Sequence, residues 1–203
     1  MKKHLQIILA ILLVSITSLA SAQKSANDVV NNIVKSLRDK KNVELNFKYQ
    51  YVVDVSNQSD EQFGTAYFQG EAYKILLSEQ QTISDGKTIW SYLVDDEEVV
   101  VSNATDGSDN TPLKLLTTLD KDYTAVFTDD DVIMLTNSEG QYKLINLLID
   151  PKKSTLKGME IYADDGSKMT IAISEMKFDQ DLRDNFFTFD EKAHPNVDII
   201  DMR

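Results

Sequence analysis

The segment from Val43 to Val53 most constrains the fold, because apolar and polar side chains alternate along most of its length. The apolar positions are Val43, Leu45, Phe47, Tyr49, Tyr51 and Val53. Alternation of this kind places the two sets of side chains on opposite faces of a β-strand. A sheet with one dry face and one wet face is typical of antiparallel architectures. The segment therefore predicts a long strand of an antiparallel sheet.

Ten further runs have the composition and length of strands, and most are separated by turn residues such as Asp85-Gly86, which favours a tight hairpin. They are Gly64–Phe68, Tyr73–Leu77, Gln80–Ser84, Thr88–Leu93, Glu98–Ser102, Tyr123–Phe127, Val132–Asn137, Tyr142–Ile149, Leu156–Ala163 and Ser167–Phe178. About eleven sequential strands in one domain imply a strongly curved antiparallel sheet or an open half-barrel.

Two segments have helical rather than alternating periodicity. Near the start, Val29, Val30, Ile33, Val34 and Leu37 recur at helical spacing, and Ser25 or Asn27 is placed to cap the helix. In the middle of the chain, Pro112 opens a short apolar helix that contains Leu113, Leu115, Leu116 and Leu119. We expect both helices to cover the dry face of the sheet. The predicted class is mainly β with helices, or α+β.

The first 22 residues have the pattern of a secretory signal peptide. Lys2 and Lys3 precede an apolar run from Leu5 to Ile16, and Ala20-Ser21-Ala22 provides a cleavage site. The apolar run is shorter than the ~20 residues that a spanning helix needs. We therefore expect residues 1–22 to be removed and residues 23–203 to form one domain exported to the periplasm. That mature chain carries a net charge of −14, which repels nucleic acid.

The residues needed for most enzyme chemistry are missing from the sequence. The chain has no Cys and only two His residues, His4 and His194. The acids cluster in turns, and Asp129-Asp130-Asp131 lacks the spacing of a calcium loop. No pattern indicates a catalytic group, a metal site or a cofactor. We therefore predict a binding protein, not an enzyme, and a periplasmic hydrolase is the least favoured alternative.

Several motifs in order along the mature chain resemble one known family. They are Ile83-Ser84-Asp85-Gly86-Lys87-Thr88-Ile89-Trp90-Ser91-Tyr92, Tyr67-Phe68-Gln69-Gly70-Glu71-Ala72-Tyr73-Lys74, and Phe187-Thr188-Phe189 followed by Pro195-Asn196-Val197-Asp198. This ordered set is similar to the LolA-like periplasmic lipoprotein carriers. The resemblance implies an incomplete barrel whose mouth is covered by helices and whose cavity takes the acyl chains of lipoproteins on their way to the outer membrane.

The resemblance also implies a chaperone role and a set of partners. These are acylated lipoproteins, an inner-membrane lipoprotein-releasing complex and an outer-membrane acceptor, with the chain itself a monomer. A lipid- or lipoprotein-sensing regulatory protein on the same fold is the alternative, since the two roles share these sequence features. Lys74-Ile75-Leu76-Leu77 stands where the family has an Arg-Pro pair and a Phe-Arg-Trp strand. Where the resemblance implies an arginine that latches the lid, this sequence has no clear equivalent, and Lys74 is its counterpart by position alone.

The aromatic residues on the strands are the candidates for the cavity. We expect the acyl-chain cavity to be lined by Phe47, Tyr49, Tyr51, Trp90 and Tyr92. We expect the helical lid to consist of Val30, Ile33, Val34, Leu37, Leu113 and Leu116. Ordinary core packing is the competing explanation for the aromatic residues, and periodicity does not separate the two.

Overall fold

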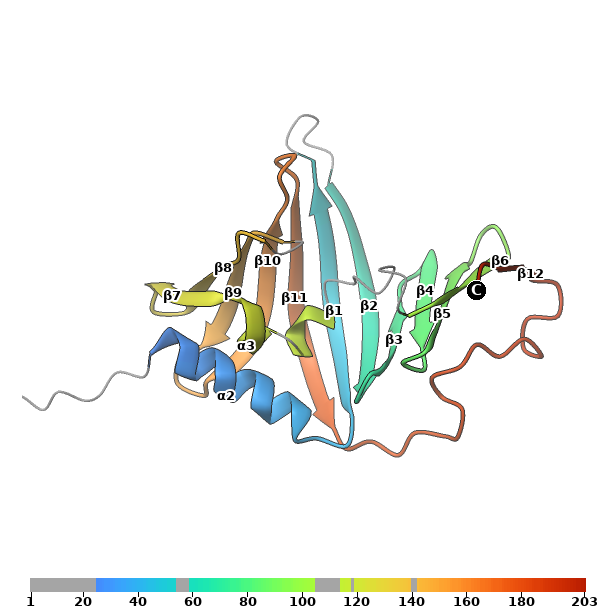
Figure 1. Ribbon diagram of the computed structural model, residues 1–203, viewed down its shortest axis with the longest axis horizontal. Helices are drawn as coiled ribbons and strands as arrows, with labels where there is room; N and C mark the ends of the chain where they lie inside the picture. The colour runs from blue at the N-terminus through green and yellow to red at the C-terminus, as the bar shows by residue number, and fades with distance from the viewer. Residues whose placement is uncertain (1–24, 54–58, 105–113, 118, 140–141) are drawn as a thin grey trace, which may run out of the picture.

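The computed structural model describes residues 25–53, 59–104, 114–117, 119–139 and 142–203. The predicted signal peptide at residues 1–22 and the predicted lid residue Leu113 lie outside this part of the chain. Within it, the chain forms one twelve-stranded sheet with two α-helices and one 3₁₀ helix on one side. Figure 1 shows helix α2 crossing in front of β9, β10 and β11.

The strands form a single open sheet. Their bounds are β1 (Val43–Val52), β2 (Ser59–Gln69), β3 (Ala72–Leu76), β4 (Gln80–Ser84), β5 (Thr88–Leu93), β6 (Glu98–Asn103), β7 (Thr124–Asp129), β8 (Val132–Thr136), β9 (Leu144–Asp150), β10 (Thr155–Tyr162), β11 (Lys168–Phe178) and β12 (Asp198–Asp201). Their order is β12-β6-β5-β4-β3-β2-β1-β11-β10-β9-β8-β7. β7 and β12 lie at the two edges of the sheet and do not pair with each other, so the barrel is not closed. The predicted curved, open half-barrel is confirmed.

One strand differs from the antiparallel prediction. β12 pairs with β6 in parallel, whereas every other neighbouring pair is antiparallel. From the sequence, this end of the chain is expected to be a polar tail. The physical reason is that all four residues of β12 are exposed. Its sequence therefore has no alternation of buried and exposed positions from which a strand could be predicted.

The N-terminal helix forms as predicted. α2 (Ala26–Arg38) begins with a capping box, in which the Asp28 N–H donates to Ser25 Oγ at 3.1 Å and the Ser25 N–H donates to the Asp28 carboxylate at 3.3 Å. The mid-chain segment forms the 3₁₀ helix η1 (Lys114–Thr117) and the single-turn helix α3 (Leu119–Asp122). Leu116 and Leu119 are buried, so this segment covers the sheet as expected.

The register shows which residues share a face of the sheet. Residues directly opposite each other on paired strands share a face. One row of such partners runs from β1 to β5 through Val43, Phe68, Tyr73, Ser84 and Ile89. The adjacent row, on the other face, runs through Glu44, Tyr67, Lys74, Ile83 and Trp90. The inner face, which carries Val43, lies under α2.

The C-terminal segment covers the outer face. After β11 the chain passes over the face that carries Tyr67, where the Phe186 ring lies 4.8 Å from the Tyr67 ring. Phe189 then contacts Tyr92 at 5.4 Å between ring centroids. A second hydrophobic cluster, which contains Ile83, Tyr92, Val99 and Phe189, forms beneath this segment. It is separate from the main core under α2.

Candidate functional site

The apolar stripe of α2 faces the inner face of the sheet. Val29, Val30, Ile33, Val34 and Leu37 are all buried, and Val34 is fully inaccessible. Their partners include the buried residues Leu45, Phe47, Ile145, Leu147, Met159, Ile161 and Ile171. The helix is therefore held on the sheet mainly by apolar contact, which is nondirectional and lets one apolar partner replace another.

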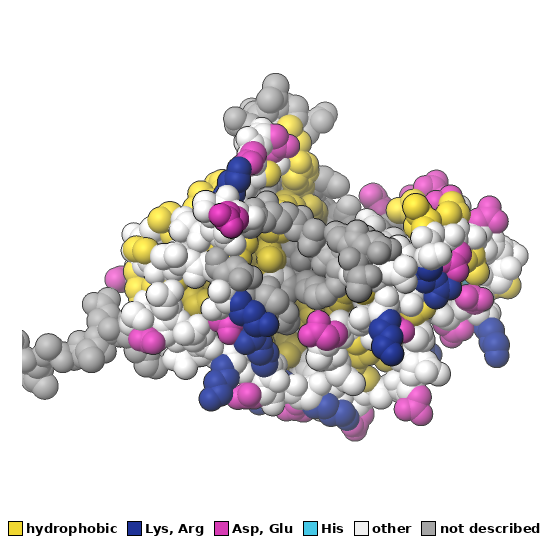
Figure 2. Space-filling view, in the orientation of Figure 1, with side chains coloured by type: hydrophobic (Ala, Val, Ile, Leu, Met, Phe, Trp, Pro, Cys, Tyr) yellow, Lys and Arg dark blue, Asp and Glu magenta, His cyan; other side chains and the backbone are white. Residues whose placement is uncertain are grey.

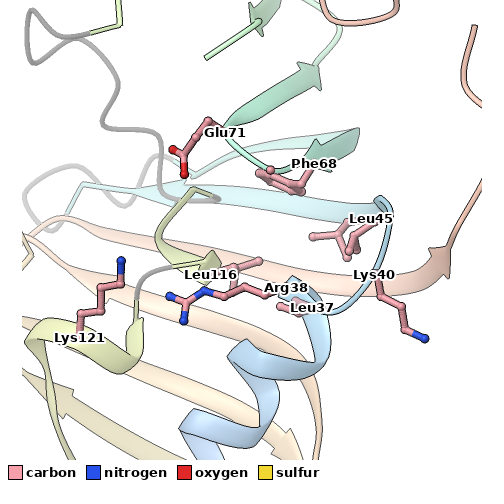
Figure 3. A pocket seen from close by; sticks show the side chains of 10 residues that line it. Leu37, Arg38, Lys40, Leu45, Phe68, Glu71, Leu116 and Lys121 are labelled. Atoms are coloured by element: carbon pink, nitrogen blue, oxygen red, sulfur yellow. The ribbon is translucent and has the colours of Figure 1, made fainter. Parts of the chain in front are cut away.

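A pocket of about 190 Å³ opens between the C-terminal end of α2 and the sheet. Its apolar wall combines Leu45 and Phe68 from the sheet with Leu37 and Leu116 from the helical layer (Figure 3). Pockets that take whole small-molecule ligands measure roughly 300–1,000 Å³. The existing space is therefore smaller than a typical ligand pocket.

Charged side chains form the rim of the pocket. Arg38 and Lys121 reach it from α2 and α3, and Glu71 lies across from them (Figure 3). Lys40 also lines the pocket, but its ammonium group points away from the centre. The site is thus an apolar hollow with a mainly basic edge.

An ion pair joins α2 to α3 at this rim. The Arg38 guanidinium donates from Nη1 and Nη2 to the two carboxylate oxygens of Asp120, at 2.7 Å each. Two parallel hydrogen bonds of this type fix the relative orientation of the partners. The pair therefore ties the two helical elements together across the pocket mouth.

The two ends of α2 are attached differently. Immediately after the helix, the buried Asn42 side chain donates to the Gln180 carbonyl at 2.8 Å and accepts from the Gln180 N–H at 2.9 Å. The Lys41 N–H donates to Asp179 at 2.7 Å. Near the other end, the Asn27 side chain accepts one hydrogen bond, from the Ala125 N–H of β7 at 3.2 Å. The chain directly after α2 is therefore attached by more hydrogen bonds than the start of the helix.

A second, more open hollow of about 680 Å³ lies near the N-terminal half of α2. Val29, Phe127 and Ile149 provide its apolar surface. Its charged lining residues are Asp129, Asp130 and Lys152. The two openings along α2 therefore differ in charge, since the rim at the C-terminal end is mainly basic and this one is mainly acidic.

The structure brings most of the predicted lid residues together. Val30, Ile33, Val34 and Leu37 form the buried stripe of α2, and Leu116 of η1 lies at the pocket beside them. They all belong to one hydrophobic core. Leu113 lies outside the described residues.

The predicted cavity residues fall into two groups on opposite faces. Phe47 is buried on the inner face, and Tyr49 and Tyr51, which are half-buried, follow it there at alternate positions of β1. Trp90 and Tyr92 lie on the outer face, in or against the cluster under the C-terminal segment. The two groups are not brought together, so they do not line one cavity.

Lys74 also lies on the outer face, away from the lid. Its ammonium group is 5.2 Å from the centroid of the Phe186 ring. Burial lowers the pKa of Lys74, and the nearby Arg183 lowers it further. The positional counterpart of a latching arginine therefore contacts the C-terminal segment instead of α2.

Sequence reasoning missed the residues at the pocket rim. Arg38 and Asp120 are 82 positions apart, and no local pattern links them. The sequence offers one weak indication of this pair. Arg38 is a basic residue at the end of the first helix, and Asp120 is an acid in the mid-chain helical segment. Phe68 was placed on a strand, but its face follows only from pairing with Val43.

No helix among the described residues is long and apolar enough to cross a membrane. Likewise, no group of three or more acidic or histidine side chains in these ranges is arranged to hold a metal ion.

Comparison with known proteins identifies the family. A family model described as outer membrane lipoprotein carrier protein LolA matches residues 77–190, which is more than half of the chain. The chain belongs to this family. No curated protein matches the chain at a significant level.

The solved structures that this LolA-family chain resembles are distant from it in sequence. An uncharacterized conserved protein from Thermus thermophilus is 12% identical with a TM-score of 0.55, over 88% of this chain and 99% of that one. A LolA superfamily protein from Nitrosomonas europaea is 13% identical with a TM-score of 0.48, over 82% and 99%. A putative outer membrane lipoprotein-sorting protein domain from Vibrio parahaemolyticus is 10% identical with a TM-score of 0.46, over 83% and 97%. The likeness to the Thermus thermophilus protein concerns the fold alone.

Proposed function

We propose that this protein is a periplasmic carrier that holds the acyl chains of lipoproteins between α2 and the inner face of the sheet. The observation that carries the proposal is the pocket between α2 and the sheet, which lies at the edge of a mainly apolar interface. Membership of the LolA family agrees with this role.

Energetic balance favours a movable lid. Removing a 14-carbon chain from water yields on the order of 11 kcal/mol, at about 0.8 kcal/mol per CH₂. When such a chain enters, the stripe of α2 exchanges contact with the sheet for contact with the chain, so little apolar surface reaches water. In the empty state the stripe covers the sheet again. Loading and release then require only modest free-energy differences.

The residues in this proposal follow the inner face of the sheet. The floor consists of Phe47, Tyr49 and Tyr51 together with Leu45 and Phe68. The lid consists of Val30, Ile33, Val34, Leu37, Leu113 and Leu116. Trp90 and Tyr92 are left out of the cavity because they lie on the outer face.

The rest of the proposal concerns processing and partners. Residues 1–22 serve as a cleaved signal peptide, and residues 23–203 act in the periplasm as a monomeric chaperone. An inner-membrane lipoprotein-releasing complex supplies the cargo and an outer-membrane acceptor receives it. The protein binds its cargo without transforming it and uses no cofactor.

A tether across the lid tests the proposal. Because the chain has no Cys, Arg38→Cys and Asp120→Cys together provide two unique thiols that a short bismaleimide can join. We expect the untethered double variant to take up a fluorescent monoacylglycerol, as the native protein does. The tethered protein should lose most of this uptake, because α2 and α3 can no longer separate at the pocket mouth. Equal uptake by tethered and untethered protein would contradict the lid.

A second tether serves as the matched control. Lys143 and Asp164 form an exposed ion pair of 2.6 Å at a distance from α2, so the same chemistry on Lys143→Cys and Asp164→Cys spans a similar gap. This tether should leave uptake unchanged. Affinity purification from periplasm should then recover acylated lipoproteins with the native protein and not with the lid-tethered one.

A further inference from the structure

We propose that the outer edge of β12 binds an extended segment of a partner protein, one with apolar side chains at alternate positions and Lys or Arg at one end. Such a segment adds to the sheet as a further strand, through main-chain hydrogen bonds. The inference goes beyond the carrier function, because β12 and its neighbour β6 lie at the end of the sheet away from α2 (Figure 1).

The backbone of β12 presents main-chain groups on its outer side. At the start of the strand, the Asp198 N–H donates to the Glu97 carbonyl next to β6, at 2.8 Å. Successive N–H groups of a strand point to opposite sides, so those of Ile199 and Asp201 point away from β6. No strand of the described residues pairs with this side of β12. An edge of this kind is a template for pairing with another chain.

Exposed apolar side chains are concentrated on this edge. Seven large hydrophobic residues are exposed in the described part of the chain, and three of them lie in its last five positions: Ile199, Ile200 and Met202. Ile199 ends a row of paired residues that begins with Tyr92 and Val99. Tyr92 and Val99 are buried in the second hydrophobic cluster, whereas Ile199 is 46% exposed. An apolar side chain of an added strand, placed beside Ile199, would continue this row.

Acidic residues at one end of the edge determine the charge of the partner. Asp198 pairs with Glu98 at the start of the two strands, and the turn before β6 contains Asp95, Asp96 and Glu97. No ion pair among the described residues includes any of these five carboxylates. Figure 2 shows acidic side chains at this end of the sheet. They attract Lys and Arg of a partner and disfavour a second copy of this chain, whose net charge is −12.

A designed peptide serves as the probe in the test. It is labelled with fluorescein and has ten residues, in which Val and Thr alternate and three Lys stand at one end. Two versions, with the Lys at the N-terminal or the C-terminal end, cover parallel and antiparallel pairing. We expect one of them to bind the full-length protein in fluorescence anisotropy titrations at low salt. Replacing its Lys by Glu should weaken binding by about fivefold or more. Equal binding of the Lys and Glu peptides overturns the partner's charge.

Main-chain pairing has its own control. The same peptide with N-methyl groups on every second residue keeps its side chains and its charge but cannot donate a full row of main-chain hydrogen bonds. It should bind much more weakly. Hydrogen exchange then locates the peptide, since the Ile199 and Asp201 amides should exchange more slowly in the complex. Equal binding of the methylated peptide, or unchanged exchange at both amides, overturns the inference.

A matched pair of variants compares the two edges of the sheet. Ile199→Thr keeps a β-branched side chain and removes apolar surface at β12. It should weaken peptide binding by about two- to fivefold, the effect of one cross-strand pair. Val126 is 50% exposed on β7, at the other edge, and Val126→Thr should leave binding unchanged. Equal weakening by the two variants would mean that the peptide does not select β12, and the inference is overturned.

Sedimentation of the protein alone tests a second copy as the occupant. A monomer in both the native protein and Ile199→Thr supports the partner assignment. A dimer that Ile199→Thr abolishes would assign the edge to self-association and overturn it. Uptake of a fluorescent monoacylglycerol by Ile199→Thr should equal that of the native protein, so failure of this inference leaves the carrier function standing.

Discussion

Arg38 and Asp120 form a bidentate ion pair that joins the last turn of α2 to α3, with two hydrogen bonds of 2.7 Å. The Arg38 and Asp120 side chains remain 38% and 19% exposed, respectively. An ion pair this accessible to water contributes at most about 1 kcal/mol. It can therefore fix how the helices meet at the pocket mouth without preventing them from separating. We regard it as a weak latch for the proposed lid.

Breaking the latch should make loading faster. In Asp120→Asn the ion pair is lost while Arg38 remains at the pocket rim. We expect uptake of a fluorescent monoacylglycerol to accelerate about two- to fivefold in stopped-flow measurements, because opening no longer costs the energy of the pair. The free energy of unfolding in urea should fall by about 1 kcal/mol or less.

A similar ion pair at the end of the chain serves as a control. It shows whether a faster uptake comes from loss of the Arg38–Asp120 pair or from the loss of any ion pair. Arg203 donates to Asp201 from Nη2 at 2.6 Å and from Nε at 2.9 Å, at the end of the chain. Arg203→Gln removes a similar bidentate pair far from α2. Its uptake rate should equal that of the native protein. An unchanged rate in Asp120→Asn would mean that the Arg38–Asp120 pair does not restrain the lid.

Gly64 should tolerate no side chain, because it leaves room for Phe47 in the floor of the proposed cavity. A Cβ at Gly64 would lie 2.7 Å from Phe47 Cζ and 2.8 Å from the Leu76 carbonyl oxygen. We expect Gly64→Ala to lower the free energy of unfolding by about 1–3 kcal/mol, as overpacking does. Urea denaturation measures this. Adding Phe47→Leu should cost less in the Gly64→Ala background than alone, and strict additivity would show that Phe47 is not the obstructing group.

Glu160 should make stability depend on acid pH. Burial raises the pKa of Glu160, but hydrogen bonds from Tyr162 at 2.9 Å, Lys168 at 3.1 Å and Asn146 at 3.4 Å outweigh it and hold the pKa below the ordinary value of 4.5. The unfolded chain therefore binds this proton more readily than the folded protein. The contribution is present above pH 4.5 and is lost as the pH falls through the lowered pKa.

Replacing Glu160 should flatten this dependence. We expect Glu160→Gln to be less stable than the native protein by about 1 kcal/mol at pH 7, with the difference shrinking as the pH is lowered toward 3. Urea denaturation across this range measures it. Glu191→Gln, at an exposed position of the C-terminal segment, should show no such convergence. Parallel pH profiles for native protein and Glu160→Gln would contradict the assignment.

Local patterns were sufficient to predict the elements that form the proposed lid and floor. The alternation from Val43 to Val53 identified β1 and its dry face, because burial on one side of a strand imprints a period of two. The spacing of Val30, Ile33 and Val34 identified α2, because burial on one side of a helix gives a repeat of three to four residues. The open sheet followed from the number of strands and the turns between them.

Long-range pairing set the limits of prediction from the sequence. A period of two at Trp90 and Tyr92 says that they share a face, but not which face of the sheet it is. The sequence contains Phe187 and Phe189 in a motif near its end, yet only the fold places Phe189 against Tyr92 and forms a second hydrophobic cluster on the outer face. The parallel strand β12 depends on contact with β6, which is about a hundred residues away in the sequence and leaves no local signal.

The single tryptophan offers a direct test of this two-faced arrangement. Trp90 packs against the cluster of Ile83, Tyr92 and Phe189 on the outer face, on the opposite side of the sheet from α2. We expect its fluorescence emission to stay unchanged when an acyl ligand without a fluorophore binds under α2. Phe189→Ala should shift the emission to longer wavelength, because it lets water reach the cluster. A ligand-induced shift as large as that of Phe189→Ala would place the acyl chain on the outer face and contradict the cavity proposed here.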